Sequence, residues 1–233
     1  MTTFQYNQRI IENYPNIVGG IIIANGMSNQ PTSDALCQLY MAEQEIVKKR
    51  IGNTPLSEIK SLSAWRKAIS AFGVSPTKYR SAAEALLRRL TKKGDIPVIN
   101  TLVDIGNLVS IRYALPVAIL DAHEIAGAVT VHYSAGTETY TELGNDAVIH
   151  PEVGEVIFSD DKKMVVARRW CWRQSATSAA NETTTNAVIT VEAHHDDAQD
   201  DIQNAISDLL DLLNAYAGGT FESAILTTKN PKI

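Results

Sequence analysis

Apolar residues recur along this chain with two spacings, one typical of helices and one typical of strands. Spacing near 3.6 residues predicts helices over five segments: 35–50, 63–71, 82–93, 99–111 and 197–217. Alternating or continuous apolar runs of strand length predict strands over seven segments: 16–24, 115–120, 126–133, 139–143, 156–159, 163–172 and 187–193. Helices come first, then a β region rich in hairpins, then a helix. This order predicts an α+β fold, layered, with an antiparallel-rich β region and flanking helices, in one compact domain spanning 1–233.

Three polar residues interrupt the apolar segment 99–111 and its start, namely Asn100, Asp104 and Asn107. At helical spacing they fall at i, i+4 and i+7, so one helix presents all three on one face. Polar groups inside apolar segments are hydrogen-bonded or line a pocket. The spacing therefore predicts a polar site here, and the alternative is that these residues cap and tie down neighbouring turns.

A second distinctive stretch runs from Ala167 to His195 and holds two Trp, three Arg and a Thr-rich strand that carries Glu192. If 163–172 is one strand, its alternation puts Arg168, Trp170 and Trp172 on one face and Arg169 on the other. Arginine and tryptophan can hold phosphates and stack on bases, although such residues also pack at the edge of a core. His194 and His195 are adjacent on a strand and face opposite ways, which favours a strand exit over a metal site.

Charge is segregated along the chain although the net charge is only −5. Residues 48–93 contain twelve basic and two acidic side chains, and residues 192–211 contain seven acidic ones and no Lys or Arg. A local basic surface can attract phosphates even on an acidic protein, and Arg80, Arg88 and Arg89 are its candidate RNA contacts. The simpler alternative is that both runs are solvated helix faces.

Several classes of protein are not favoured by the sequence. No apolar run approaches the length of a membrane span, and the short run near the N-terminus lacks a basic segment before it. Cys37 and Cys171 lie far apart, as free thiols of a cytoplasmic protein do. There is no nucleophile-elbow serine, no phosphate-binding glycine loop and no metal-ligand spacing, so we expect neither a cofactor nor a metal.

The segments 97–121 and 167–195 resemble the B3/B4 editing domain of the bacterial phenylalanyl-tRNA synthetase β subunit, in free-standing form. The likeness covers roughly 60–197, which becomes the expected B3/B4-like core, with an N-terminal strand and helices over 1–59 and a helix and tail over 198–233. The resemblance implies that Asn107 belongs to the editing pocket and that Glu192 reads a side-chain hydroxyl of the mischarged amino acid. Two pocket positions differ from the synthetase pattern, since Gly106 stands for a Thr and Ala118 for a His, which makes the wall smaller and less polar.

The resulting hypothesis is a stand-alone tRNA-editing-like domain that hydrolyses the ester of a mischarged aminoacyl-tRNA by positioning water. Asn107 is the expected ester or water positioner. The substrate-binding set is Glu192, Asn100, Asp104, Gly106 and Ala118, and the RNA-binding set is Arg168, Arg169, Trp170, Arg80, Arg88 and Arg89. Asn107 and Glu192 are expected to face one cavity, with the basic residues on its rim. The alternative is a non-catalytic module that binds a free amino acid or RNA; membrane and DNA partners are not expected.

Overall fold

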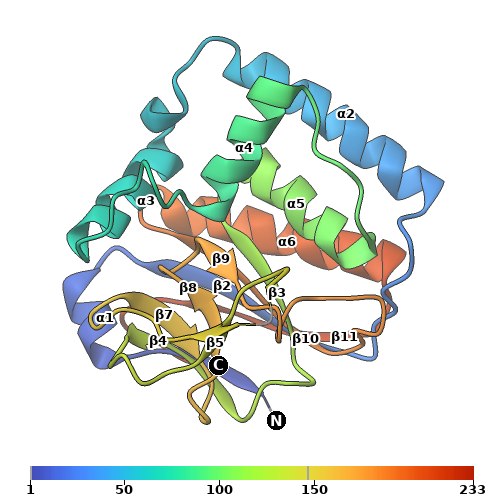
Figure 1. Cartoon of the computed structure of the whole chain (residues 1–233). Coiled ribbons are helices and arrows are strands. Elements are labelled where there is room, and N and C mark those ends of the chain that lie inside the picture. The colour runs from blue at the N-terminus through green and yellow to red at the C-terminus, as the bar shows by residue number, and fades with distance from the viewer. Residues whose placement is uncertain (1, 146) are drawn as a thin grey trace.

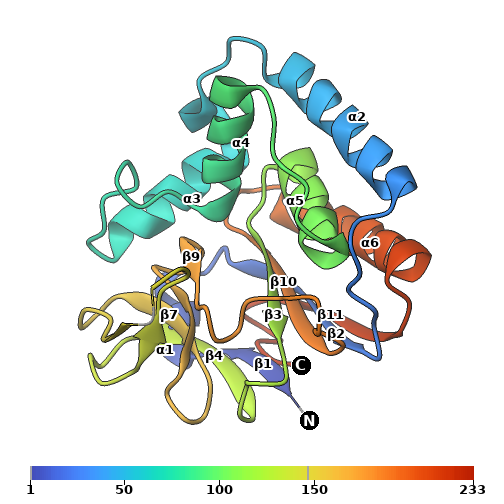
Figure 2. The ribbon, with the colours of Figure 1, turned by 45° about the vertical axis from the view of Figure 1, so that its right-hand side comes forward.

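Helices form one layer above two β-sheets in the computed structural model, which describes residues 2–145 and 147–233 (Figure 1). The view turned by 45° shows the same layers, with α1 as the helix that lies down beside the strands (Figure 2). The helices are α1 (Gln8–Asn13), α2 (Asp34–Ile51), the 3-10 turn η1 (Leu56–Glu58), α3 (Lys60–Ala71), α4 (Ala82–Lys93), α5 (Thr101–Tyr113) and α6 (Ala198–Tyr216). The strands are β1 (Thr3–Tyr6), β2 (Val18–Asn25), β3 (Val117–Asp121), β4 (Ala128–Tyr133), β5 (Tyr140–Thr141), β6 (Val148–Ile149), β7 (Val156–Ser159), β8 (Val165–Arg168), β9 (Arg173–Gln174), β10 (Ala187–Ala193) and β11 (Thr220–Leu226).

The central sheet has the order β11-β2-β10-β3, and all of its pairs are antiparallel. Both faces of its middle strands are covered, which is why β2 reads as a continuous apolar run and β10 is buried along its whole length. A Cβ on Gly20 of β2 would lie 2.5 Å from Ile206 of α6. The glycine therefore lets α6 lie close against the sheet.

The second sheet has the order β1-β4-β7-β8-β9, and β1 runs parallel to β4. It packs against the face of the central sheet that is turned away from the helical layer. Strand β10 separates the two cores by alternation: Ile189 and Val191 belong to the helical side, and Val188 belongs to the side of the second sheet. The apolar residues of β10 are thus divided between the two cores.

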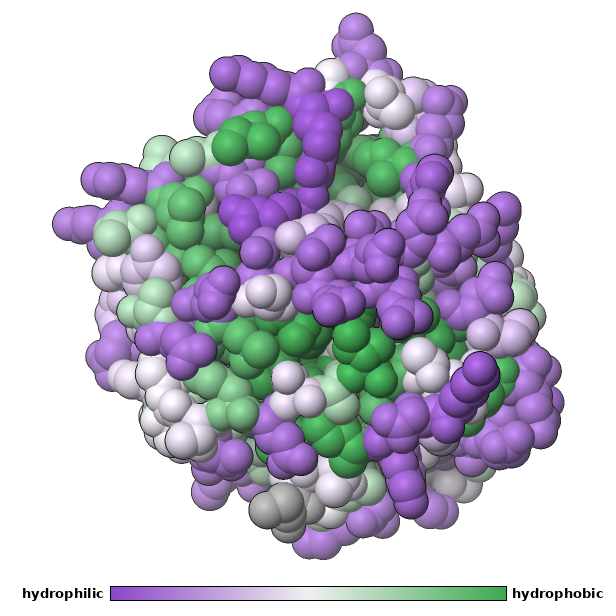
Figure 3. All heavy atoms as spheres, turned by 180° about the vertical axis from the view of Figure 1, so that it is seen from behind, coloured by the Kyte–Doolittle hydropathy of each residue, from purple (hydrophilic) through white to green (hydrophobic). Residues whose placement is uncertain are grey.

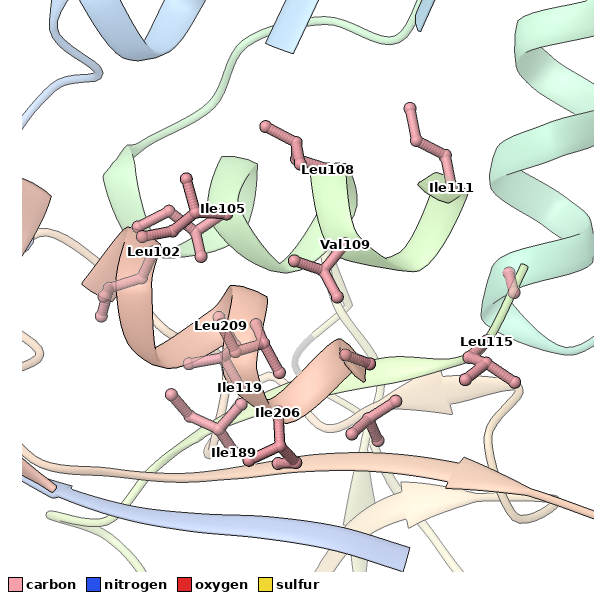
Figure 4. Packing of buried hydrophobic residues seen from close by; sticks show 14 of the residues in the cluster. Leu102, Ile105, Leu108, Val109, Ile111, Leu115, Ile119, Ile189, Ile206 and Leu209 are labelled. Carbon is pink, nitrogen blue, oxygen red and sulfur yellow. The ribbon is translucent and has the colours of Figure 1, made fainter. Parts of the chain in front are cut away.

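The helical core is an apolar contact between α5, α6 and the central sheet (Figure 4). Leu102, Ile105 and Val109 come from α5, and Leu209 comes from α6. They lie above the sheet residues Ile119 and Ile189, as the close view shows. Burial on this scale fixes α5 as a structural helix along most of its surface.

The α+β class and most of the expected elements are confirmed. The bounds of α4 and β10 agree with the expected segments 82–93 and 187–193. The expected strand 163–172 is wrong in its second half, because β8 ends at Arg168 and the next two residues have positive φ. Arg169 (φ 46°) and Trp170 (φ 63°) turn the chain back toward β9, so the expected alternation of side chains fails there.

Strands from both ends of the chain complete the two sheets. β1 joins the second sheet, while β2 and β11 form half of the central sheet. The termini also meet, since Phe4 and Ile233 exchange backbone hydrogen bonds of 3.2 and 3.0 Å. The segment 60–197 accordingly lacks strands that its own sheets need.

Polar side chains cover much of the face opposite to that of Figure 1, with apolar side chains showing between them (Figure 3). Across the described ranges, none of the helices is both long and apolar enough to cross a membrane.

Candidate functional site

A small pocket of about 70 Å³ lies between the central sheet and the β8–β9 turn. Its inner wall is formed by Ala118 of β3 and by Thr190 and Glu192 of β10. The remaining lining comes from Ala82, Pro116, Val117, Phe158, Ala167, Trp170, Cys171, Trp172, Arg173 and Gln174. Residues from five strands and from the start of α4 therefore converge on one place, which makes this pocket the candidate site.

Glu192 is the one acidic residue of the pocket lining and is 2% exposed. Its Oε1 accepts hydrogen bonds from the hydroxyl of Tyr6 (2.7 Å) and from Nε1–H of Trp170 (3.1 Å). Burial raises the pKa of Glu192 to about 7, while these two hydrogen bonds act in the opposite direction. A buried carboxyl that changes charge near neutral pH is a feature of functional sites.

The backbone around Glu192 is arranged to hold this carboxylate. Glu192 lies opposite Gly19 in the β2–β10 register, and a Cβ on Gly19 would come 2.1 Å from the Tyr6 hydroxyl oxygen. The glycine thus leaves the space that Tyr6 occupies. Nε1–H of Trp65 donates to the backbone carbonyl oxygen of Glu192 (3.1 Å). Trp170 itself belongs to the turn with positive φ that follows β8.

The structure brings together three of the expected site residues, Glu192, Ala118 and Trp170, in this pocket. The expectation that Asn107 faces the same cavity is wrong. Asn107 is on α5 and lies beside Tyr40 of α2 in the helical layer, while Glu192 points from the opposite face of the central sheet. The strand alternation of β10 is the reason, since Glu192 shares its face with Val188.

The other polar residues of this helix hold its first turn in place. Asn100 is the N-cap of α5 and accepts from the backbone N–H of Val103 (3.0 Å). Asp104 accepts from the N–H of Ile99 and from the Thr32 hydroxyl, and burial raises its pKa. Neither residue lines the pocket, so the structure gives both the capping role that the sequence left open as an alternative.

Gly106 also lies outside the pocket. A Cβ at this position would come 3.1 Å from Ile119 of β3, so the glycine serves the close contact between α5 and the sheet. The expectation that Gly106 belongs to the substrate-binding set is therefore wrong as well.

The expected RNA-binding residues of the second stretch are enclosed by the fold. Arg168 is 6% exposed and makes two hydrogen bonds, of 2.8 and 2.7 Å, to Glu155. Arg169 is equally enclosed and lies over the rings of Tyr79 and Trp172. Trp170 is fully buried, so it cannot stack on a base in this conformation. The turn at 169–170 places Trp170 in the core, and Glu155 encloses Arg168, so these residues lack the exposed position expected of RNA contacts.

Part of the basic run 48–93 lines a different cavity, of about 520 Å³, between η1, α3 and α4. Arg80, Arg88 and Lys92 belong to it, together with Arg66 and the carboxylate of Glu84. Arg66 is bound to Glu84 at 2.7 Å, whereas Arg89 pairs with Asp95 at 3.5 Å outside this cavity. The expected position of the basic residues on the rim of the Glu192 pocket is therefore wrong, although α4 touches both cavities through Ala82 and Arg88.

Two features of the site were not foreseen from the sequence. Tyr6 belongs to the short strand β1, which carries too few residues for a recognisable pattern. His194 follows Glu192 by two residues and lies among the rings of Tyr14, Trp65 and Trp170. Burial lowers the pKa of His194 to about 3, so this imidazole is neutral at physiological pH.

Metal-binding side chains do not gather at this place or elsewhere in residues 2–145 and 147–233. His195, next to His194, has its Nε2 2.9 Å from the carboxylate of Asp201 in α6. The His194–His195 pair marks the exit of β10, as its sequence position indicated.

Two comparisons with known proteins bear on this chain. Half of an N-terminal fragment of the phenylalanyl-tRNA synthetase β-subunit from Pyrococcus horikoshii aligns with 96% of this chain, at 10% identity and a TM-score of 0.45. The chain thus spans about half the length of that fragment, and no curated protein matches it in sequence. The family model of the B3/4 domain matches residues 64–217, which is more than half of the chain. This chain therefore belongs to the B3/4 domain family.

Proposed function

We propose that this B3/4 domain hydrolyses the ester of a mischarged aminoacyl-tRNA, with the Glu192 pocket receiving the amino-acid side chain. The observation that supports the proposal most strongly is the position of the Glu192 carboxylate: Tyr6 and Trp170 hold one of its oxygens, and the residue itself lines a small pocket. Such a fixed acceptor is the kind of group that distinguishes one side chain from another.

Hydrolysis of an aminoacyl ester does not require a side-chain nucleophile, because the ester is already activated. Cys171 lines the pocket, but burial raises the pKa of its thiol well above the ordinary value, so it stays protonated and is a poor nucleophile. The proposed chemistry is therefore binding and orientation: the pocket fixes the acyl group, and a water attacks the carbonyl carbon. The terminal ribose hydroxyl of the tRNA can help to orient that water.

The tRNA backbone is proposed to follow α4 from one cavity to the other. Ala82 at the start of α4 lines the Glu192 pocket, and its N–H donates to the carbonyl of Cys171 (2.8 Å). Arg88 and Lys92 on the same helix line the basic cavity. Ten residues of α-helix rise about 15 Å, so phosphates next to a bound terminal nucleotide are within reach of these side chains.

Deacylation of a panel of mischarged tRNAs tests the proposal. The wild-type chain is expected to hydrolyse at least one mischarged tRNA of the panel faster than the uncatalysed rate in buffer alone. Glu192→Gln is expected to change which amino acid is released, while Asn107→Ala serves as a matched control on the other side of the sheet and leaves the rates unchanged. Uncatalysed rates for every member would end the hydrolysis proposal, and a strong effect of Asn107→Ala would move the site to the helical layer.

A second candidate function is a non-catalytic module that binds a free amino acid. The ion pairs near the pocket favour it: Arg168 pairs with Glu155, and Arg173 pairs with Glu142. These two cations are therefore already neutralised and do not offer themselves to a tRNA phosphate. Calorimetry with free amino acids, and with uncharged tRNA, separates the two candidates. Tight binding of a free amino acid without any deacylation would support the module.

A further inference from the structure

Two polar groups on β10 face the Glu192 pocket without a partner. Oε2 of Glu192 and the hydroxyl of Thr190 make no hydrogen bond to any residue of the described chain, whereas Oε1 of Glu192 accepts two. The two residues are two positions apart on a strand, so their side chains share one face. Each residue is 2% exposed.

Both unpaired atoms are open to the pocket. The fully enclosed side-chain atoms that lack a partner in the described chain are Tyr40 Oη, His194 Nε2 and His195 Nδ1, and neither pocket atom is among them. A polar group that faces a pocket without a partner in the protein is free to bond a ligand, and a few such groups fix the ligand's orientation. Two unpaired groups side by side therefore indicate a ligand with a polar atom that bonds both.

The pocket sets the size of that ligand. Its volume is about 70 Å³. An engineered cavity of about 150 Å³ is known to hold benzene, so this pocket has room for roughly half of an aromatic ring. Phe158 and Trp170 line the pocket and are buried in the core, so they do not readily move to enlarge it. A side chain of two or three heavy atoms fits.

The clamp on Glu192 sets the polarity that the ligand meets. Tyr6 and Trp170 both donate to Oε1, so Oε2 remains as an acceptor. Thr190 adds a hydroxyl, which donates as well as accepts. A ligand hydroxyl can donate its proton to Oε2 and accept the proton of Thr190, and this satisfies both groups with one atom.

We propose that the pocket selects a small side chain bearing a hydroxyl, that of serine or threonine, with Glu192 and Thr190 as the specificity-determining residues. The inference rests on the proposed function, because it names the class of amino acid whose ester would be hydrolysed. The α-ammonium of any small amino acid could also donate to Oε2 of Glu192. Alanine has this ammonium but no side-chain hydroxyl, so an alanine substrate distinguishes the two donors.

The first test measures kcat/KM for one tRNA charged with serine, threonine, alanine or tyrosine. We expect serine and threonine to exceed alanine by about a hundredfold or more, because a site built around a hydroxyl rejects an analogue that lacks it. Tyrosine is expected to be hydrolysed at the uncatalysed rate. Equal rates for alanine and serine, or hydrolysis of the tyrosyl ester, would overturn the inference.

Two substitutions check the residues. Thr190→Val keeps the shape, removes the hydroxyl and is expected to lower the serine-to-alanine ratio about tenfold. Glu192→Gln must turn its carbonyl oxygen toward the two clamp donors, so its amide N–H₂ faces the pocket in place of an acceptor, and the ratio is expected to collapse. Ratios unchanged by both substitutions in folded protein would contradict the assignment.

Binding measurements separate this inference from the proposed function. Calorimetry with L-serinamide, L-alaninamide and L-tyrosinamide requires no hydrolysis. A preference for serinamide that is lost in Thr190→Val, in a chain that deacylates nothing, would support the pocket and refute the proposed hydrolysis. Absence of any preference among the three amides, together with absence of deacylation, would refute both.

Discussion

Glu192 is a buried carboxyl whose pKa is shifted in the folded protein. Its ordinary pKa of 4.5 is raised to about 7, chiefly by burial. The folded protein thus holds this proton more tightly than the unfolded chain does. The stabilisation from the proton is fully present below about pH 4.5 and is lost as the pH rises through about 7.

This linkage gives a prediction that does not depend on activity. Between about pH 4.5 and 7, wild type should lose roughly 3 kcal/mol of stability relative to Glu192→Gln, which has no proton to release. Urea unfolding of both proteins across this range measures the difference. His194, with its pKa lowered to about 3, acts in the opposite direction but equally in both proteins. A difference independent of pH would show that Glu192 titrates normally.

Asn100 carries a second prediction at the residue scale. As the N-cap of α5 it accepts from Val103, so Asn100→Ala should destabilise the protein by about 1 kcal/mol. Asn100→Asp retains an acceptor and should cost less. Thermal unfolding compares the two variants, and equal losses would mean that packing, not capping, determines the effect.

At the scale of elements, local signals in the sequence explain which parts of the fold were predictable. Ser81 and Glu84 have the Ser-x-x-Glu spacing that is typical of a helix start, and Ser81 accepts from the N–H of Glu84 at the start of α4. Strand β10 also has the expected bounds. These features depend on residues a few positions apart. The Tyr6–Glu192 contact joins residues 186 positions apart, and no local spacing reports it.

The same distinction explains the misplaced residues. The helical spacing of Asn100, Asp104 and Asn107 was correct, but it does not say which side of the sheet the helix covers. Only the pairing of β10 between β2 and β3 determines that Glu192 faces away from α5. The turn at Arg169 and Trp170 could not be predicted either, because neither residue is a glycine or another type that favours positive φ.

The register of β2 and β10 leads to a prediction about Gly19. Gly19→Ala places a Cβ where the Tyr6 hydroxyl lies, so Tyr6 must move away from Glu192. We expect a loss of about 1–3 kcal/mol. In a Tyr6→Phe background the hydroxyl is already absent, and the loss should shrink. A double-mutant cycle measured by urea unfolding gives the coupling, and additive effects would mean that the two residues do not interact.

At the scale of the whole molecule, the two sheets depend on strands from both ends of the chain. A fragment of residues 60–197 lacks β1, β2 and β11, which leaves β10 without its longest partner. We expect this fragment to show no cooperative unfolding transition by circular dichroism, while the full chain shows one. A cooperative transition in the fragment would establish 60–197 as an independent folding unit.

The basic cavity provides a test of the proposed tRNA contact. Replacing both Arg88 and Lys92 by alanine removes two cations from it. If both contact phosphates, the slope of log Kd against log salt should fall by about two. The exposed Lys229, near the C-terminus, provides the matched control as Lys229→Ala. An unchanged slope in the double variant would place the tRNA elsewhere.

The backbone pairing of Phe4 with Ile233 brings both ends of the polypeptide out of the fold at one point. A unit with this property can be spliced into a surface loop of a host protein as a single cassette, since the host chain enters and leaves at neighbouring positions. It can equally be cut open between the exposed residues Thr77 and Lys78 and rejoined through a short linker between its old ends. The pairing of the two ends thus allows further polypeptide to be joined at both of them without rearranging the strands.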